Sequence, residues 1–219
     1  MEERKMAPER KKGPAGRGAK LPAFDPAPSV KAALPMLKKA KARFALVGGM
    51  ALAHYLPPSL QRFTKDVDLA VRYENRRGLA AIVAESGYRA RRLSIGGISV
   101  RKEGIAFDLV DRHPELDALF EAAIKAAYKS GPSLRVENCT VRVVPKNYLI
   151  ALKLATGEEK DQRDVQALLF TVKRQGYHRL RSLIRRLLGP AGALRLDSLA
   201  RRIGHPAVPG EFYQYHRAD

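Results

Sequence analysis

The segment Asp66-Val-Asp-Leu-Ala-Val-Arg72 constrains the fold of this chain more than any other. In an extended strand, successive side chains point to opposite faces of the sheet. Three aliphatic side chains of the segment therefore share one face, and Asp66 and Asp68 share the other. Two carboxylates this close repel each other, which is costly unless a cation lies between them. The segment predicts a strand with one face in the core and a pair of acids on the other face.

A third carboxylate, Asp108, lies in the middle of a second apolar strand, Ile105-Ala-Phe-Asp-Leu-Val110. An unpaired buried charge is expensive, so an acid here needs a partner or a function. Acids occupy 22 of 219 positions, so an acid-x-acid spacing arises by chance about twice in the chain. The placement in strands, where Asp is depleted, is therefore the stronger signal. Oxygen ligands of this kind suit Mg²⁺ or Mn²⁺, and we expect Asp66 and Asp68 to hold such an ion.

Gly48 and Gly49 lie between a predicted strand at residues 43–47 and a predicted helix at residues 50–56. Backbone amides at a helix N-terminus bind phosphate, and glycine lets the anion approach closely. A tight turn is the alternative reading of the pair. The chain has no Gly-x-x-x-x-Gly-Lys-Ser/Thr loop and no Gly-x-Gly-x-x-Gly motif, which removes support for a Walker-type ATPase or a Rossmann dehydrogenase.

Periodicity divides the chain into three parts. Residues 1–22 form a basic tail rich in Gly, Pro and Ala, which predicts disorder. Residues 23–145 alternate between helices and strands, and residues 146–219 are helical and basic. Besides the elements above, we expect helices within residues 29–37, 78–86, 114–128, 147–156, 160–175, 179–188 and 194–203, a strand at 139–144, and one or two extended segments between 88 and 105.

The chain carries 41 Lys and Arg against 22 Asp and Glu, a net charge of +19. Arginines concentrate late in the chain, where Arg181, Arg185 and Arg186 are candidates for nucleic-acid contact. A solvated helix face is the alternative reading. The single cysteine, Cys139, excludes an intramolecular disulfide, and no apolar run is long enough to cross a membrane. We expect a cytoplasmic protein with no membrane partner.

The order of these motifs resembles the nucleotidyltransferase superfamily of the DNA polymerase β type, and most closely the small prokaryotic AbiEii-type toxins of type IV toxin–antitoxin systems. The resemblance runs through Val47-Gly48-Gly49-Met-Ala-Leu52 and Arg62-Phe-Thr64-Lys-Asp66-Val-Asp68, and continues at Lys153 and Lys160-Asp161-Gln-Arg-Asp164. It implies an α+β fold, a small mixed sheet flanked by helices, with a helical C-terminal part. Gly49 stands where many catalytic members carry serine.

The resemblance implies roles for individual residues. Gly48, Gly49, Arg62 and Thr64 would bind the triphosphate of a nucleotide such as ATP. Asp66, Asp68 and Asp108 would hold the metal, and Lys153 would contact phosphate or the acids. The implied reaction moves a nucleoside monophosphate to an acceptor, such as RNA, tRNA or protein, and an antitoxin protein is an implied partner. Two alternatives remain open at this stage: an inactive module of the same fold that binds nucleotide or RNA, and a basic nucleic-acid binder whose acids are incidental.

Overall fold

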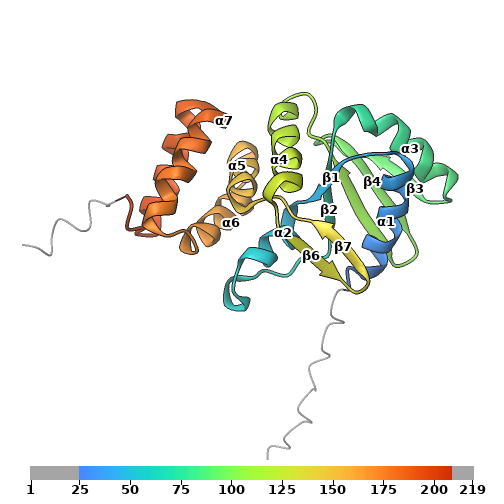
Figure 1. Ribbon diagram of the computed structural model, residues 1–219, viewed down its shortest axis with the longest axis horizontal. Helices are drawn as coiled ribbons and strands as arrows, with labels where there is room; N and C mark the ends of the chain where they lie inside the picture. The colour runs from blue at the N-terminus through green and yellow to red at the C-terminus, as the bar shows by residue number, and fades with distance from the viewer. Residues whose placement is uncertain (1–24, 209–219) are drawn as a thin grey trace, which may run out of the picture.

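The computed structural model describes residues 25–208, so the predicted tail at residues 1–22 lies outside the described residues (Figure 1). The described chain also contains two short 3-10 turns, Pro58–Leu60 and Tyr73–Asn75. In chain order, its helices and strands are α1 (Ala27–Lys39), β1 (Phe44–Leu46), α2 (Gly48–Tyr55), β2 (Val67–Val71), α3 (Arg76–Glu85), β3 (Arg89–Arg92), β4 (Gly97–Lys102), β5 (Ile105–Val110), α4 (Asp117–Ser130), β6 (Ser133–Val136), β7 (Cys139–Arg142), α5 (Lys146–Thr156), α6 (Glu159–Phe170) and α7 (Arg174–Arg202).

A five-stranded mixed sheet with the order β1-β2-β5-β4-β3 forms the centre of the fold. Strands β2 and β5 are parallel, and the other neighbouring pairs are antiparallel. Strands β6 and β7 form a separate hairpin, joined to β1 by a single bridge between Leu46 and Val143. The prediction of an α+β fold with a small mixed sheet flanked by helices is confirmed.

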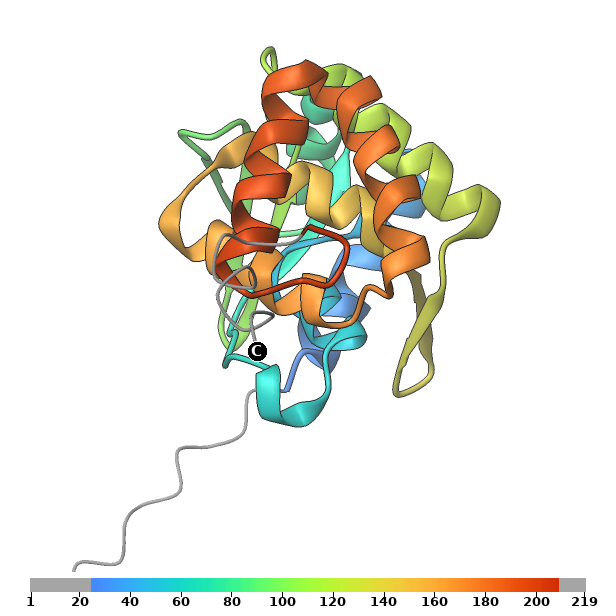
Figure 2. The ribbon, with the colours of Figure 1, turned by 90° about the vertical axis from the view of Figure 1, so that its left-hand side faces the viewer.

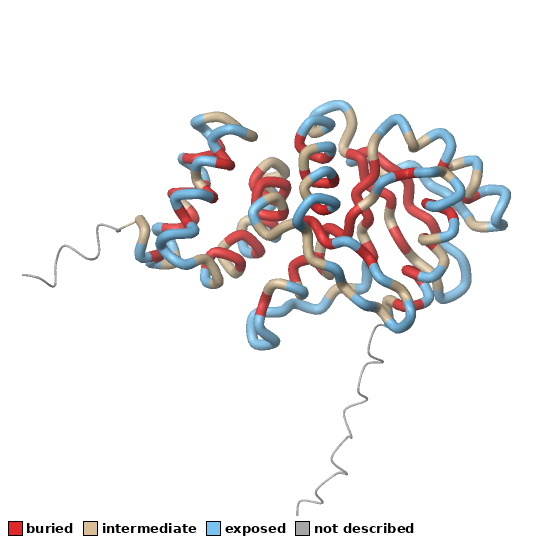
Figure 3. Tube along the Cα trace, in the orientation of Figure 1, coloured by how far each residue is buried: buried red, intermediate tan, exposed pale blue. Residues whose placement is uncertain are grey.

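The two faces of this sheet have different coverings. On the apolar face, buried side chains such as Val100, Phe107 and Leu109 belong to the hydrophobic core, and α1 and α3 pack there. On the face that carries the acids, α2 and α4 pack against β2, and α5 packs against both helices. Figure 3 shows the buried residues following the central strands and the inner sides of these helices. On the acid face, helices α2 and α4 therefore cover the part of the sheet formed by β1 and β2.

The C-terminal helices continue the same core. Buried side chains from α5, α6 and α7 join one hydrophobic cluster with those of the sheet. Helix α7 is broken at Gly189, whose φ of 71° lies in the left-handed region that glycine adopts without strain. Figure 2 shows the two halves of α7 side by side. The break confirms the predicted separation of two helices at this point, whereas the domain boundary near residue 145 stays a prediction.

Some local predictions were wrong. Helix α1 begins at Ala27, two residues before the expected start at residue 29, and the Ala27 amide donates to the Asp25 carboxylate. Ser29 is buried within the helix, and its hydroxyl accepts a hydrogen bond from the Ala106 amide at the start of β5. The helix expected at residues 160–175 ends at Phe170. Among the described helices, none combines the length and apolar character needed to cross a membrane.

Candidate active site

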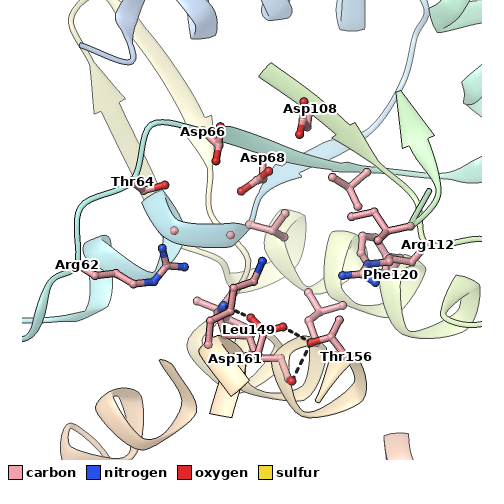
Figure 4. Close-up of a pocket in the computed structure, with 18 residues that line it drawn as sticks. Arg62, Thr64, Asp66, Asp68, Asp108, Arg112, Phe120, Leu149, Thr156 and Asp161 are labelled. Atoms are coloured by element: carbon pink, nitrogen blue, oxygen red, sulfur yellow. Dashed lines mark hydrogen bonds and ion pairs between the residues drawn. The ribbon is translucent and has the colours of Figure 1, made fainter. Parts of the chain in front are cut away.

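The predicted site residues of the sheet and of α5 line one pocket with a volume of about 290 Å³. Figure 4 shows the acids on the strands at one side of it, opposite the end of α5. The pocket is lined by Val47, Gly48, Gly49, Arg62, Thr64, Asp66, Asp68, Ile95, Asp108, Val110, Arg112, Phe120, Leu149, Leu152, Lys153, Thr156, Lys160 and Asp161. The set includes all eight residues that the sequence assigned to catalysis, metal binding and nucleotide binding.

The acids converge because β2 and β5 are parallel neighbours. Asp68 and Asp108 are direct partners in the register of these strands, so their side chains leave the same face about 5 Å apart at the backbone. Asp66 lies one residue before β2, on the same face and exposed. Burial, together with the charges of Asp108 and Asp66, raises the pKa of Asp68 to about 6. Asp68 therefore lies where a cation would relieve both the burial and the repulsion.

Asp108 is held by an arginine of the neighbouring strand. The Arg101 Nη1 atom donates to Oδ1 of Asp108 at 2.9 Å, and also to the carbonyl oxygens of Val100 at 2.9 Å and Phe107 at 3.0 Å. Across residues 25–208, no three acidic, histidine or cysteine side chains form a ready-made ligand cluster. The oxygen donors of Asp66, Asp68 and Asp108 still fit Mg²⁺ or Mn²⁺ by their chemistry.

The two glycines bring α2 close to these residues. Gly48 has a φ of +63°, and a Cβ atom there would lie 1.9 Å from Oδ2 of Asp68. At Gly49, a Cβ atom would lie 2.6 Å from Oγ1 of Thr64. Helix α2 begins at Gly48, so the first amides of the helix have no partner within it. The pair is thus a tight turn beside Asp68 and, at the same time, the start of a helix whose first amides have no partner within the helix.

A buried ion network forms the opposite wall. The Lys153 side chain is buried, and its Nζ atom donates to Oδ1 of Asp161 at 2.8 Å and to Oδ2 of Asp164 at 2.6 Å. Arg62 donates to both oxygens of Asp164, at 2.9 and 3.0 Å. Burial alone would raise the pKa of Asp164, but the hydrogen bonds from Arg62 and Lys153 outweigh it and lower that pKa. The network ties the loop before β2 to α5 and α6.

Comparison with known proteins agrees with this arrangement. The family model for the nucleotidyl transferase AbiEii toxin of type IV toxin–antitoxin systems matches residues 36–169, more than half of the chain. The chain belongs to the AbiEii family. It is an enzyme that transfers nucleotidyl groups. The suspected family and the predicted enzyme class are therefore confirmed.

The solved structures similar to this AbiEii-family chain are distant from it in sequence. The antibiotic-resistance factor ANT(2'')-Ia in solution has a TM-score of 0.48 at 17% identity, over 73% of this chain and 91% of that chain. A nucleotidyltransferase-like protein from Paracoccidioides brasiliensis has a TM-score of 0.44 at 14% identity, over 87% of this chain and 98% of that chain. No curated protein matches the chain significantly.

Two cationic side chains that line this AbiEii-family pocket, Arg112 and Lys160, were not predicted as site residues from the sequence. Arg112 lies two residues after the end of β5 and is half-buried, with a φ of 50° that is unusual for a residue other than glycine. Within residues 25–208, it has no ion-pair partner. Lys160 lines the pocket from α6, and among the residues that the structure describes its one ion-pair partner is the exposed Glu158 at 3.1 Å. The signal for Arg112 was its place at the end of the strand that carries Asp108. Figure 4 shows Arg112 and Phe120 on the side of the pocket away from Arg62.

The arginines predicted to contact nucleic acid lie on α7 and do not line this pocket. Arg181 donates from Nε to Asp197 at 2.9 Å, and Tyr177 donates to the same carboxylate at 2.8 Å. This contact fastens the two halves of α7 together. Arg185 and Arg186 are exposed. Their role in nucleic-acid binding stays a prediction, and the geometry gives Arg181 a structural part.

Proposed function

We propose that this protein is a metal-dependent nucleotidyltransferase that moves a nucleoside monophosphate from a nucleoside triphosphate to a hydroxyl group of an acceptor, with RNA, including tRNA, ahead of protein. One observation carries the proposal: Asp68 and Asp108 are direct partners in parallel strands, and both line one pocket with Gly48 and Gly49 at the start of α2. Mg²⁺ or Mn²⁺ would be held by these two acids and Asp66. When bound, the metal would polarise the α-phosphate and offset negative charge on the departing pyrophosphate.

The triphosphate fits the other side of the pocket. The amides of Gly48 and Gly49 and the Thr64 hydroxyl offer hydrogen-bond donors to phosphate oxygens. Lys153 uses two of its three ammonium protons on carboxylates, so one N–H remains for a phosphate oxygen. Arg62 is already bidentate with a carboxylate and acts here by holding the network. These contacts would orient the α-phosphate toward the acids.

Transfer then needs a proton acceptor beside the incoming hydroxyl. We assign this role to Asp108, which is half-buried and reaches the same space as Asp68. The acceptor oxygen forms a bond to the α-phosphorus, the bond from that phosphorus to pyrophosphate breaks, and the proton of the hydroxyl passes to Asp108. Arg101 donates to this carboxylate and positions it before the reaction. The family also implies an antitoxin protein as partner.

The test is label transfer from each α-labelled triphosphate, with Mg²⁺ or Mn²⁺, to purified tRNA, total RNA and lysate protein. We expect one acceptor to gain label with the wild type, and Asp68→Asn and Asp108→Asn to lose at least about a hundredfold in rate. Glu103→Gln, an exposed carboxylate in the β4–β5 turn, is the matched control and should retain the rate. Nucleotide binding without transfer to any acceptor would favour the inactive module instead, and equal transfer by Asp68→Asn would refute the assigned chemistry.

A further inference from the structure

The register of the sheet continues the row of acids toward the free edge. Asp108 of β5 pairs with Asp68 on one side and with Ser99 of β4 on the other, and Ser99 pairs with Arg91 of β3. Directly paired residues in a sheet point to the same face. Arg91 therefore lies on the face that carries the metal-site acids, three strands from Asp68.

Two more arginines share this face. Arg101 lies two residues from Ser99 on β4 and pairs with Arg89 of β3. We call Arg89, Arg91 and Arg101 the arginine strip. The side chain of Arg101 is 44% exposed although it binds Asp108, and Arg89 and Arg91 are exposed. Within residues 25–208, Arg89 and Arg91 have no ion-pair partner. The strip thus presents three positive charges beside the acids, with one member in contact with them.

The strip lies on the open part of the acid face. Helix α3 packs against β3 and β4, and its buried residues Leu79 and Val83 join the core on the apolar face. On the acid face, the described helices α2 and α4 pack against the β1–β2 side. An exposed row of arginines on an edge strand costs self-repulsion, which a polyanion on the same surface would relieve.

We propose that the arginine strip binds the sugar-phosphate backbone of the acceptor RNA and guides its reactive end to Asp108. This inference rests on the proposed function, and it assigns the acceptor to a surface other than the arginines of α7. Three strand spacings of about 4.8 Å separate Arg91 from Asp68, about 14 Å in all. At about 3.4 Å per nucleotide, that distance accommodates roughly four stacked nucleotides.

The charge and position favour RNA over other acceptors. A small cationic acceptor would be repelled by three arginines, and the strip offers no carboxylate other than the metal-site acids to hold it. RNA supplies a phosphate at each nucleotide and ribose hydroxyls at its end, which suits a row of cations that leads to a transfer site. Arg101 can serve both functions because only Nη1 of its guanidinium is used by Asp108 and the backbone.

The test compares two double variants of the same hairpin. Arg89→Gln/Arg91→Gln removes two charges from the acid face, whereas Arg92→Gln/Lys102→Gln removes two from the opposite face, since Arg92 pairs with Ile98 and Lys102 with Ile105. Binding of labelled tRNA is measured by fluorescence anisotropy over a series of salt concentrations, alongside transfer kinetics. We expect the first variant to weaken RNA binding at least about fivefold and to reduce the slope of log K against log salt by about 1.4, or 0.7 per lost contact.

Transfer by Arg89→Gln/Arg91→Gln should show a raised KM for RNA and an unchanged KM for the triphosphate, with wild-type values for the opposite-face control. Equal losses in both double variants, or a loss confined to Arg185→Gln/Arg186→Gln, would overturn the inference. So would label transfer to protein alone. RNA binding through the strip without any nucleotidyl transfer would instead refute the proposed function and leave the strip as an RNA-binding surface.

Discussion

Gly48 gives the sharpest test of how the diglycine turn and the acids depend on each other. A Cβ atom at this position would lie 1.9 Å from Oδ2 of Asp68, whereas ordinary contacts begin at 3.4 Å. In Gly48→Ala, the carboxylate or the turn must therefore move by about 1.5 Å. A misplacement of about 1 Å at a reacting centre costs about a hundredfold in rate. We expect kcat for nucleotidyl transfer to fall by at least that factor.

Part of the effect of Gly48→Ala comes from the backbone alone. The φ of +63° at Gly48 costs a residue with a Cβ atom about 1–2 kcal/mol, and in a chain of this size that lowers the Tm by about 2–8 °C. Gly104 has a φ of +68°, and a Cβ atom there would meet no other atom within 4 Å, so Gly104→Ala separates the two causes. It should lose the same stability and keep the full transfer rate.

The assay is label transfer at saturating triphosphate, with each variant held at least 10 °C below its own Tm and scaled by its folded fraction. The reasoning requires a rate difference of about a hundredfold between Gly48→Ala and Gly104→Ala. Equal rates for the two variants would show that Asp68 does not need the place it has beside the turn. A larger loss of stability in Gly104→Ala would contradict the steric argument.

Three further outcomes follow from the charges. The pKa of Asp68 is raised to about 6, so folding disfavours the ionised form of this carboxyl group. With chelator present, Asp68→Asn should therefore raise the Tm above pH 6 and leave it unchanged below about pH 4. Thermal melts over a pH series measure this, and a gain in Tm at about pH 4 would contradict it. Lys153→Met leaves two buried aspartates without their ammonium partner and should lower the free energy of unfolding in urea by about 3–5 kcal/mol. A loss below about 1 kcal/mol would show that the network contributes little to stability. Arg181→Gln should lower the urea midpoint because it removes a donor to Asp197, whereas the exposed Arg185→Gln should not, and equal midpoints would refute the structural part given to Arg181.

The sequence predicts the acid site because strand alternation is a local property. Two acids two residues apart on one strand share a face wherever the strand lies, and Asp108 was recognisable by its apolar neighbours. Alternation does not say which strands are neighbours. Strands β2 and β5 are adjacent although α3, β3 and β4 lie between them in the chain. The sequence analysis did not predict this pairing, and only the family resemblance implied that Asp108 joins Asp66 and Asp68.

The rest of the site depends on contacts between distant parts of the chain. Arg62 and Asp164 are 102 positions apart, so the pairing that fixes Arg62 on the network could not be read from spacing. Arg101 supports Asp108 because β4 pairs with β5 in this register. From the sequence we expected only one or two extended segments before β5, without a register. The short strand β6 has little signal of its own, because only its pairing with β7 defines it.

The charges that line the pocket lead to a last prediction, about the order of binding. Four cations are balanced by four acids, so the pocket itself gives little attraction for a triphosphate. The cations are Arg62, Arg112, Lys153 and Lys160, and the acids are Asp66, Asp68, Asp108 and Asp161. Divalent ions held by Asp66, Asp68 and Asp108 would give the pocket a net positive charge. Triphosphate affinity measured by calorimetry should therefore rise at least about tenfold on adding Mg²⁺. The increase should be lost in Asp68→Asn and kept in Glu103→Gln. Equal affinity with chelator and with Mg²⁺ would show that the backbone amides and lysines bind the triphosphate without the acids.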